Sequence, residues 1–199
     1  MGRIPPRIRR GLVFDQPTQY KKSQHRIRNL QFVLFSTNET TICARVAAIF
    51  YSYEWKHLLK EDKYKNVIVD SLKFLVPQYC GMPNHLHIIW QAKGKKNLQE
   101  IQNSFIKHTS KEFKKLLEKD NNLQAYEVDA IDRKYNFWQR DSLNVELFTA
   151  VVFHQKLNYI HYNPVKANLC DLPEDYHFSS AMFYEKAVDH FGFLENYLG

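Results

Sequence analysis

The chain contains 199 residues, of which 44% are hydrophobic and 15% are aromatic, and its formal net charge is +7. This length suits one domain with a sizeable core, and the composition excludes a disordered chain. No apolar run approaches the roughly 18 residues that a membrane span needs, and the first residues lack the apolar segment of a secretory signal.

The positive charge is concentrated in residues 1–28, which contain eight basic residues and one acid and therefore carry all of the net charge. Three prolines, two glycines and weak hydrophobic periodicity predict a flexible basic arm over 1–28, followed by one domain over 29–199. A transit peptide is the alternative, and the prolines disfavour it. A basic arm by itself is only weak evidence for nucleic acid or an anionic membrane as partner.

The next elements alternate between strand and helix patterns. Strands are predicted at 30–37, at about 79–82, at 85–91 and around 126–128, whereas 40–50 carries no clear pattern. Helices are predicted at 55–75, at 97 to about 119, and from 146 or 147 to 162. Asn97 suits an N-cap with Glu100 at the third helical position. This order predicts an α+β fold, namely a ferredoxin-like antiparallel sheet with helices packed on it and an added C-terminal helix.

The three cysteines are scattered along the chain, at Cys43, Cys80 and Cys170, and they form no C-x-x-C pair. An odd, scattered set of cysteines is typical of reduced thiols inside a cell. The sequence therefore predicts a cytoplasmic protein that has neither a disulfide framework nor a zinc cluster.

Two histidines in the segment 82–89, Met-Pro-Asn-His-Leu-His-Ile-Ile, are the most specific feature of the sequence. On a strand, residues i and i+2 point to the same face, so His85 and His87 project together with Cα atoms about 6.5–7 Å apart. Two neighbouring imidazoles can supply part of a divalent-metal site. Taken alone, such a pair is more often two half-exposed histidines with local hydrogen bonds.

This segment resembles the H-hydrophobic-H (HUH) motif of the single-tyrosine transposases of insertion sequences, and most closely that of the REP-associated tyrosine transposases. Three further blocks resemble the same branch in the same order: KHTSK at 107–111, FWQR at 137–140 and KLNYIHYNPVKANL at 156–169. The four blocks cover about residues 75–180, and an ordered set is far more specific than a single motif. Asn168 stands where the signature has glycine, and asparagine is the next best residue for a left-handed C-cap.

The resemblance implies an enzyme that cuts and rejoins single-stranded DNA. His85 and His87 would hold Mg²⁺ or Mn²⁺, which polarises the scissile phosphate. A tyrosine on a helix would attack that phosphate and leave a 5′-phosphotyrosine and a free 3′-OH. The expected partners are a DNA hairpin and its flanking single strand, and the expected assembly is a homodimer.

The family's nucleophile is expected shortly after the W-Q block, with a third metal ligand four residues later on the same helix. Here these positions are Ser142 and Glu146. A carboxylate suits Mg²⁺ or Mn²⁺, so Glu146 is the predicted third ligand, although a helix dipole also favours an acid near a helix start. Tyr135, Tyr159 and Tyr162 are the candidate replacements for the missing tyrosine, and Tyr159 is predicted to be a core residue. Metal-bound water, Ser142 itself or a loss of cleavage are the other possibilities.

Basic residues near these blocks are candidates for DNA contacts. Four lysines share the side of the 97–119 helix opposite its apolar residues: Lys107, Lys111, Lys114 and Lys115. Such a stripe is typical of phosphate contacts and also of an ordinary solvated helix face. Arg140 and Lys166 flank the expected site, whereas Asn163 is predicted to shape the turn before Pro164. The sequence thus predicts a transposase-like enzyme; the alternatives are a domesticated DNA-binding relative without cleavage and a metal-binding or regulatory domain with no role on DNA.

Overall fold

The structure, a computed structural model, describes residues 45–73, 78–91, 97–140 and 142–196. The arm predicted over 1–28 and the strand predicted over 30–37 lie outside the described residues. Among the helices that the structure describes, none is long and apolar enough to cross a membrane.

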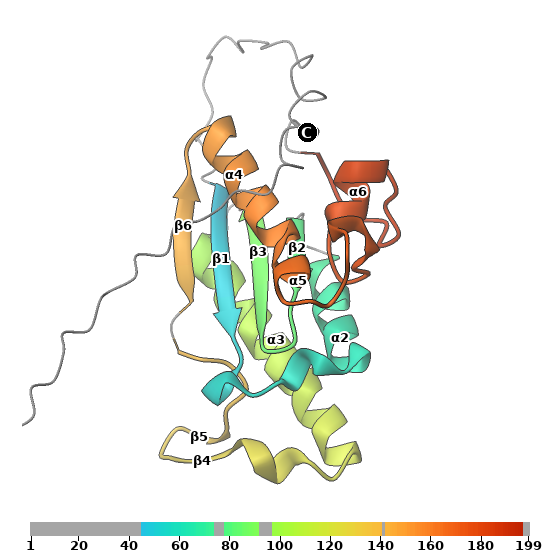
Figure 1. Cartoon of the computed structure of the whole chain (residues 1–199). Coiled ribbons are helices and arrows are strands. Elements are labelled where there is room, and N and C mark those ends of the chain that lie inside the picture. The colour runs from blue at the N-terminus through green and yellow to red at the C-terminus, as the bar shows by residue number, and fades with distance from the viewer. Residues whose placement is uncertain (1–44, 74–77, 92–96, 141, 197–199) are drawn as a thin grey trace, which may run out of the picture. The chain divides into compact units, whose positions relative to one another are not determined.

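Four strands form an antiparallel sheet in the order β2-β3-β1-β6 (Figure 1). Their bounds are β1 Arg45–Tyr51, β2 Gln78–Gly81, β3 His85–Gln91 and β6 Leu143–Leu147. The predicted strands at 79–82 and 85–91 are therefore confirmed as β2 and β3. Strand β1 comes from the segment without a clear sequence pattern, yet it pairs with both β3 and β6 and is central to the sheet.

Helices cover both faces of this sheet, and Figure 1 shows α4 (Ala150–His161) in front of it and α3 (Leu98–Lys119) behind it. Helices α2 (Asp62–Leu72) and α3 share the main hydrophobic core with one side of β1 and β3, represented by Phe50 and Ile88. Helix α4 packs in a second core cluster that includes Ile89 and Leu147. The predicted α+β class, with helices packed on an antiparallel sheet, is confirmed.

Helix α3 is the element that the sequence predicts best. The side chain of Asn97 accepts a hydrogen bond from the backbone N–H of Glu100 at 2.9 Å, and the Glu100 carboxylate accepts one from the N–H of Asn97 at 3.0 Å. This capping box satisfies two of the N–H groups that a helix start leaves unpaired. The buried side of α3 includes Phe105, Thr109 and Phe113, as the helical spacing predicts.

Three other predicted elements differ from the structure. The helix predicted at 55–75 begins only at Asp62, after 3₁₀ turns at Tyr53–Trp55 and Leu58–Lys60. The strand predicted around 126–128 is β4 (Glu127–Ala130), which follows a 3₁₀ turn at Leu123–Tyr126 and pairs with β5 (Arg133–Tyr135) in a separate hairpin. The helix predicted from 146 or 147 is wrong at its start, because 143–147 form β6 and α4 begins at Ala150. Leu-Asn-Val-Glu-Leu alternates with period two, which favours a strand.

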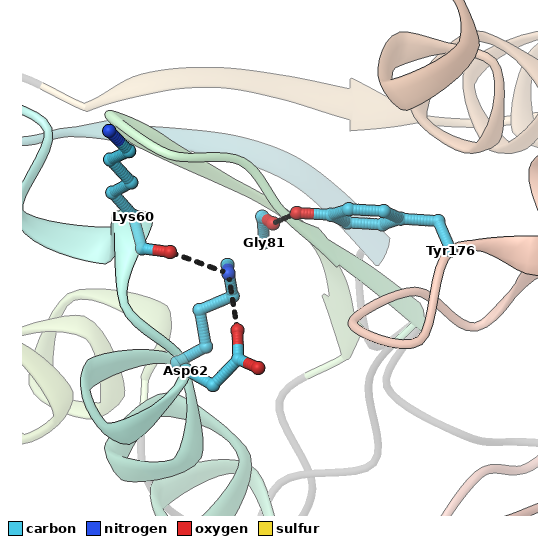
Figure 2. Close-up of polar contacts among 5 residues, drawn as sticks. Lys60, Asp62, Gly81 and Tyr176 are labelled. Carbon is cyan, nitrogen blue, oxygen red and sulfur yellow. Dashed lines mark hydrogen bonds and ion pairs between the residues drawn. The ribbon is translucent and has the colours of Figure 1, made fainter. Parts of the chain in front are cut away.

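The segment after α4 contains α5 (Asn163–Lys166), a 3₁₀ turn at Pro173–Asp175 and α6 (Ala181–Lys186). It lies along β2: the N–H of Gly81 donates to the carbonyl of Phe178 at 2.9 Å, and the Tyr176 hydroxyl donates to the carbonyl of Gly81 at 2.7 Å (Figure 2). The buried Lys65 ammonium donates to the Lys60 carbonyl and to Asp62. These contacts cover an edge strand that would otherwise expose unpaired backbone groups.

Candidate functional site

His85 and His87 lie side by side on β3, and their Nε2 atoms are 3.1 Å apart. Both belong to the face of the sheet that α4 covers, because β3 residues of the other set, such as Ile88, pack with α3. His87 is only 3% exposed and His85 is partly buried. The predicted same-face arrangement of the two imidazoles is therefore confirmed.

Burial keeps both imidazoles in the neutral form near pH 7. It lowers the pKa of His85 to about 4, and it lowers the pKa of His87 to about 3, with smaller contributions from His85 and from the Lys156 ammonium. The side-chain oxygen of Asn84 lies 2.7 Å from His85 Nδ1 and accepts its hydrogen bond. This contact places the proton on Nδ1 and leaves Nε2 as the atom with a free lone pair.

Two residues one helical turn apart, Tyr159 and Asn163, complete the surroundings of His87. The Asn163 amide nitrogen is 3.1 Å from His87 Nε2, and it donates to the Tyr159 carbonyl at 3.1 Å. The Tyr159 ring stands perpendicular to that of His87, with 5.7 Å between ring centroids. Tyr159 is 46% exposed, so the prediction that it is a core residue is wrong. Asn163 does begin α5, but its side chain also reaches the histidine pair.

Two lysines flank the Tyr159 ring. The ammonium of Lys166 is 5.3 Å from the ring centroid and that of Lys156 is 5.8 Å from it. The sequence indicated Lys166 as a residue that flanks the site, and the structure brings it there. Lys156 was missed, although it lies in the same sequence block three residues before Tyr159. An exposed aromatic ring between two ammonium groups is a favourable place for a phosphate backbone.

Ser142 and Glu146 do not join the histidine pair. Glu146 pairs with Val46, whose side chain lies in the core beneath α2 and α3, so Glu146 belongs to the opposite face of the sheet. Ser142 accepts a hydrogen bond from the Gln102 side chain of α3. On a strand, residues four apart are separated by about 13 Å and not by one helical turn. Among the described residues, no three His, Cys, Asp or Glu side chains gather to hold a metal.

The other two candidate tyrosines lie elsewhere in their elements. Tyr135 belongs to β5, where the Lys114 ammonium is 5.7 Å from its ring centroid. Tyr162 is the C-cap residue of α4 and, like Tyr159, is exposed. The tyrosine with a described ring contact to His87 is Tyr159.

The predicted lysine stripe is exposed on α3, and therefore lies on the other side of the sheet from the histidine pair: Lys107, Lys111, Lys114 and Lys115. Two of them make ion pairs within the helix, Lys114 with Glu118 at 3.5 Å and Lys115 with Glu112 at 2.7 Å. Arg140 is exposed as well. The structure therefore does not bring this stripe to the histidines.

The middle two sequence blocks meet each other in the main core. The indole N–H of Trp138, from FWQR, donates to the hydroxyl of Thr109, from KHTSK, at 3.0 Å. Both side chains are buried. Asn168, in the last block, has φ 54°, which agrees with the expected left-handed C-cap. These residues support the scaffold, whereas the first and last blocks supply the residues of the candidate site.

The arrangement of the chain resembles a known structure. A REP-associated tyrosine transposase bound to a REP hairpin matches with a TM-score of 0.53 and 14% sequence identity, over 82% of this chain and 93% of that chain. A candidate transposase from Deinococcus radiodurans R1 matches with a TM-score of 0.43 and 12% identity, over 63% of this chain and 95% of that chain. No protein-family model and no curated protein sequence matches. The resemblance expected from the four sequence blocks is thus confirmed as a similarity of fold.

Proposed function

We propose that this protein cuts and rejoins single-stranded DNA next to a hairpin, with Tyr159 as the nucleophile. The observation that carries the proposal is the contact of an exposed tyrosine with a buried histidine pair, in which the Tyr159 ring lies 5.7 Å from that of His87. The fold resembles that of a transposase bound to hairpin DNA, which supports the same conclusion. This proposal replaces Ser142 and Glu146 with Tyr159 and Asn163.

The donor atoms at the pair fit a divalent metal ion. Adjacent ligands of an octahedral ion with bonds near 2.1 Å are about 3 Å apart, and the Nε2 atoms of His85 and His87 are 3.1 Å apart. The Asn163 amide nitrogen lies at the same distance from His87. A half-turn of that amide presents its oxygen instead and gives up the hydrogen bond to the Tyr159 carbonyl. Mg²⁺ or Mn²⁺ held by His85, His87 and Asn163 would polarise the scissile phosphate.

Strand cleavage then replaces one phosphorus–oxygen bond with another and uses groups of the chain itself. The Tyr159 hydroxyl oxygen forms a bond to phosphorus and loses its proton, the bond to the 3′-oxygen breaks, and that oxygen takes up a proton. The result is a 5′-phosphotyrosine and a free 3′-OH, and the reverse reaction rejoins the strand. Lys156 and Lys166 bind the phosphates on either side of Tyr159.

The order of elements supports the finer details of the predicted architecture. Strand, helix, strand, strand, helix, strand, in the order β1, α2, β2, β3, α3, β6, is the order of a ferredoxin-like fold. Helix α4 follows as the added helix, and under this proposal it carries the nucleophile. The homodimer and the basic arm remain predictions.

The test is incubation of a labelled hairpin with single-stranded flanks and Mn²⁺, followed by a denaturing gel. We expect a covalent protein–DNA adduct with the wild-type chain and none with Tyr159→Phe, while Tyr159→Phe still binds the DNA. Tyr162→Phe is the matched control and should keep the adduct. An adduct that survives Tyr159→Phe contradicts the assignment.

The same gel separates the alternatives. Cleaved DNA without an adduct indicates metal-bound water as nucleophile. Binding without cleavage indicates a domesticated DNA-binding protein. The absence of a tyrosine from the expected position favours that alternative. Failure to bind hairpin DNA even at low salt contradicts both functions on DNA.

A further inference from the structure

Two aromatic rings follow one another from His85: the partly buried Tyr51 and then the exposed Trp55. Tyr51 is the last residue of β1 and pairs with His85, and the centroids of their rings are 5.7 Å apart. The Trp55 ring lies 4.4 Å from that of Tyr51. Trp55 is 56% exposed, whereas Trp90 and Trp138, the other two tryptophans of the chain, are 2% and 3% exposed.

The backbone holds Trp55 outward in an uncommon conformation. Glu54 and Trp55 both have left-handed φ angles, 53° and 57°, which bulky residues rarely adopt. The turn is fixed by the fully buried Ser52, whose N–H and hydroxyl both donate to the Asn84 carbonyl, at 3.0 and 2.8 Å. Asn84 also bonds His85. The outward tryptophan is thus tied to the same turn that orients the histidine, and this kind of strain gathers at functional sites.

We propose that Tyr51 and Trp55 form a stacking platform for an unpaired base of the DNA single strand, next to the phosphate at the histidine pair. The proposal rests on the proposed function, since it assigns a place to the flanking strand of that substrate. Aromatic rings bind bases of any identity through their faces, so the platform positions the strand without reading its sequence.

The charge near Tyr51 and Trp55 differs from the charge near Tyr159, which two lysines flank. The Lys56 ammonium is paired with Glu54 at 2.9 Å and donates to the Ala125 carbonyl at 2.6 Å. Because these local charges compensate each other, the contribution of the platform to DNA affinity should not depend on salt. The contribution of Lys156 and Lys166 should fall as salt rises.

The first experiment uses the tryptophan itself as the reporter. The full-length chain is titrated without divalent metal against a hairpin that carries a single-stranded flank, and tryptophan fluorescence is recorded. We expect quenching in the wild-type chain that disappears in Trp55→Phe, because the remaining tryptophans are buried. Trp55→Ala should bind about 5- to 150-fold more weakly, and Trp55→Phe should bind nearly as well as the wild type. Phe148→Ala, which removes an aromatic ring that is 82% exposed immediately after β6, is the control and should bind normally.

The second experiment moves one abasic nucleotide along the flank. At one position the missing base should weaken binding to the wild-type chain, and the same change should cost nothing further in Trp55→Ala. Equal penalties in both chains at every position overturn the proposal, and so does DNA binding without fluorescence quenching. Because the abasic series on the wild-type chain needs no variant, a folding defect of Trp55→Ala would not remove the test.

Failure of the platform and failure of the proposed function give different results. Adduct formation with Mn²⁺ but no quenching overturns the platform alone. Quenching of tryptophan fluorescence and a binding penalty for a missing base at one position, without adduct or cleavage, support the platform and contradict the proposed chemistry.

Discussion

At the scale of single residues, two asparagines hold the histidine pair. Asn84 accepts from His85 Nδ1, and the Asn163 amide lies against His87 Nε2. The first contact fixes the tautomer that leaves Nε2 available, which is the usual function of a residue that supports a metal-binding histidine. The second contact is made by the amide nitrogen, and after a half-turn the amide would supply an oxygen in place of the carboxylate expected at Glu146. Each asparagine therefore has a distinct function in the proposed site.

The first prediction concerns Asn163 as a ligand. Replacement of Asn163 by Ala should weaken Mn²⁺ binding about 10- to 100-fold, and Asn163→Asp should restore it because a carboxylate suits this ion. The measurement is calorimetric titration of the DNA-free protein with Mn²⁺. Asn122→Ala, at an exposed position after α3, is the control and should bind as the wild type does. Unchanged affinity in Asn163→Ala would remove Asn163 from the ligand set.

A second prediction at this scale concerns Glu146. Because its side chain belongs to the opposite face of the sheet, Glu146→Gln should leave both Mn²⁺ affinity and adduct formation within about twofold of the wild type. The same calorimetric titration and the same gel measure it. A loss of more than tenfold in Mn²⁺ affinity would restore Glu146 as the ligand and would require a different register for β6.

At the scale of elements, a buried hydrogen bond joins α3 to the block around Trp138, in addition to the packing of Trp138 against Phe105 and Phe113. Removal of the Thr109 hydroxyl in Thr109→Val leaves the indole N–H of Trp138 without its partner in the core. A buried donor without a partner costs about 1–3 kcal/mol, so the free energy of unfolding in urea should fall by that amount. Thr109→Ser keeps the hydroxyl and should recover most of it. Equal stability of the Val variant and the wild type would contradict this account.

Helix α4 is tied to the C-terminal segment through His161, whose Nε2 lies 2.8 Å from the Ser180 hydroxyl. Burial lowers the pKa of His161 to about 3, against about 6.5 in an unfolded chain. Between these values the unfolded state binds more protons, so stability is complete above about pH 6.5 and falls as the pH decreases toward 3. The decrease for one such histidine is at most about 1.4 kcal/mol per pH unit.

This predicts a measurable difference in urea unfolding between pH 6 and 4. His161→Gln, which keeps a polar partner for Ser180, should lose less stability per pH unit than the wild type. His108→Gln, on the exposed side of α3, is the matched control. A wild-type slope in His161→Gln would show that this histidine does not cause the acid sensitivity. His85 and His87 have lowered pKa values too, so some sensitivity should remain.

The elements also show what could be predicted from the sequence. Helix α3 and strand β3 follow local rules, because a capping box and a strong periodicity are complete within the segment. For β6 two signals in the sequence conflict: the period-two pattern of Leu-Asn-Val-Glu-Leu predicts a strand, whereas the family resemblance predicts a helix start. Strand β1 has apolar residues on both faces, so its sequence shows little alternation. The face to which Glu146 belongs depends on its pairing with Val46, a contact across 100 residues that no local pattern contains.

In the candidate site, too, only the features that follow from local spacing could be predicted. The His85 and His87 pair follows from the two-residue repeat of a strand. The four-residue spacing of Tyr159 and Asn163 was also visible, and on a helix such a spacing puts both side chains on one side. The order of the family's sequence blocks, however, predicts the nucleophile at Ser142.

At the scale of the whole described domain, the sheet separates two basic surfaces. Lys156 and Lys166 flank Tyr159 on the α4 side, and the exposed lysines of α3 lie on the other side. A single strand in contact with Tyr159 can meet the first surface directly. The second surface can only add phosphate contacts to DNA that extends around the sheet. The two surfaces should therefore affect binding and chemistry differently.

Charge removal on each surface tests this separation. The double variant Lys156→Gln, Lys166→Gln should lower adduct formation. It should also reduce the slope of log K for single-strand binding against log salt concentration by about 0.7 for each phosphate that is no longer neutralised. Lys107→Gln with Lys111→Gln should leave adduct formation at saturating DNA unchanged, because these ammonium groups lie across the sheet from His87. If the α3 pair also binds DNA, its removal should reduce the salt dependence of hairpin binding but not that of binding to the isolated flank. The measurements are affinities at several salt concentrations and adduct yields on the same two DNAs. Loss of the adduct in the Lys107→Gln, Lys111→Gln variant would contradict the separation, since those lysines would then have to act at the histidine pair through the sheet.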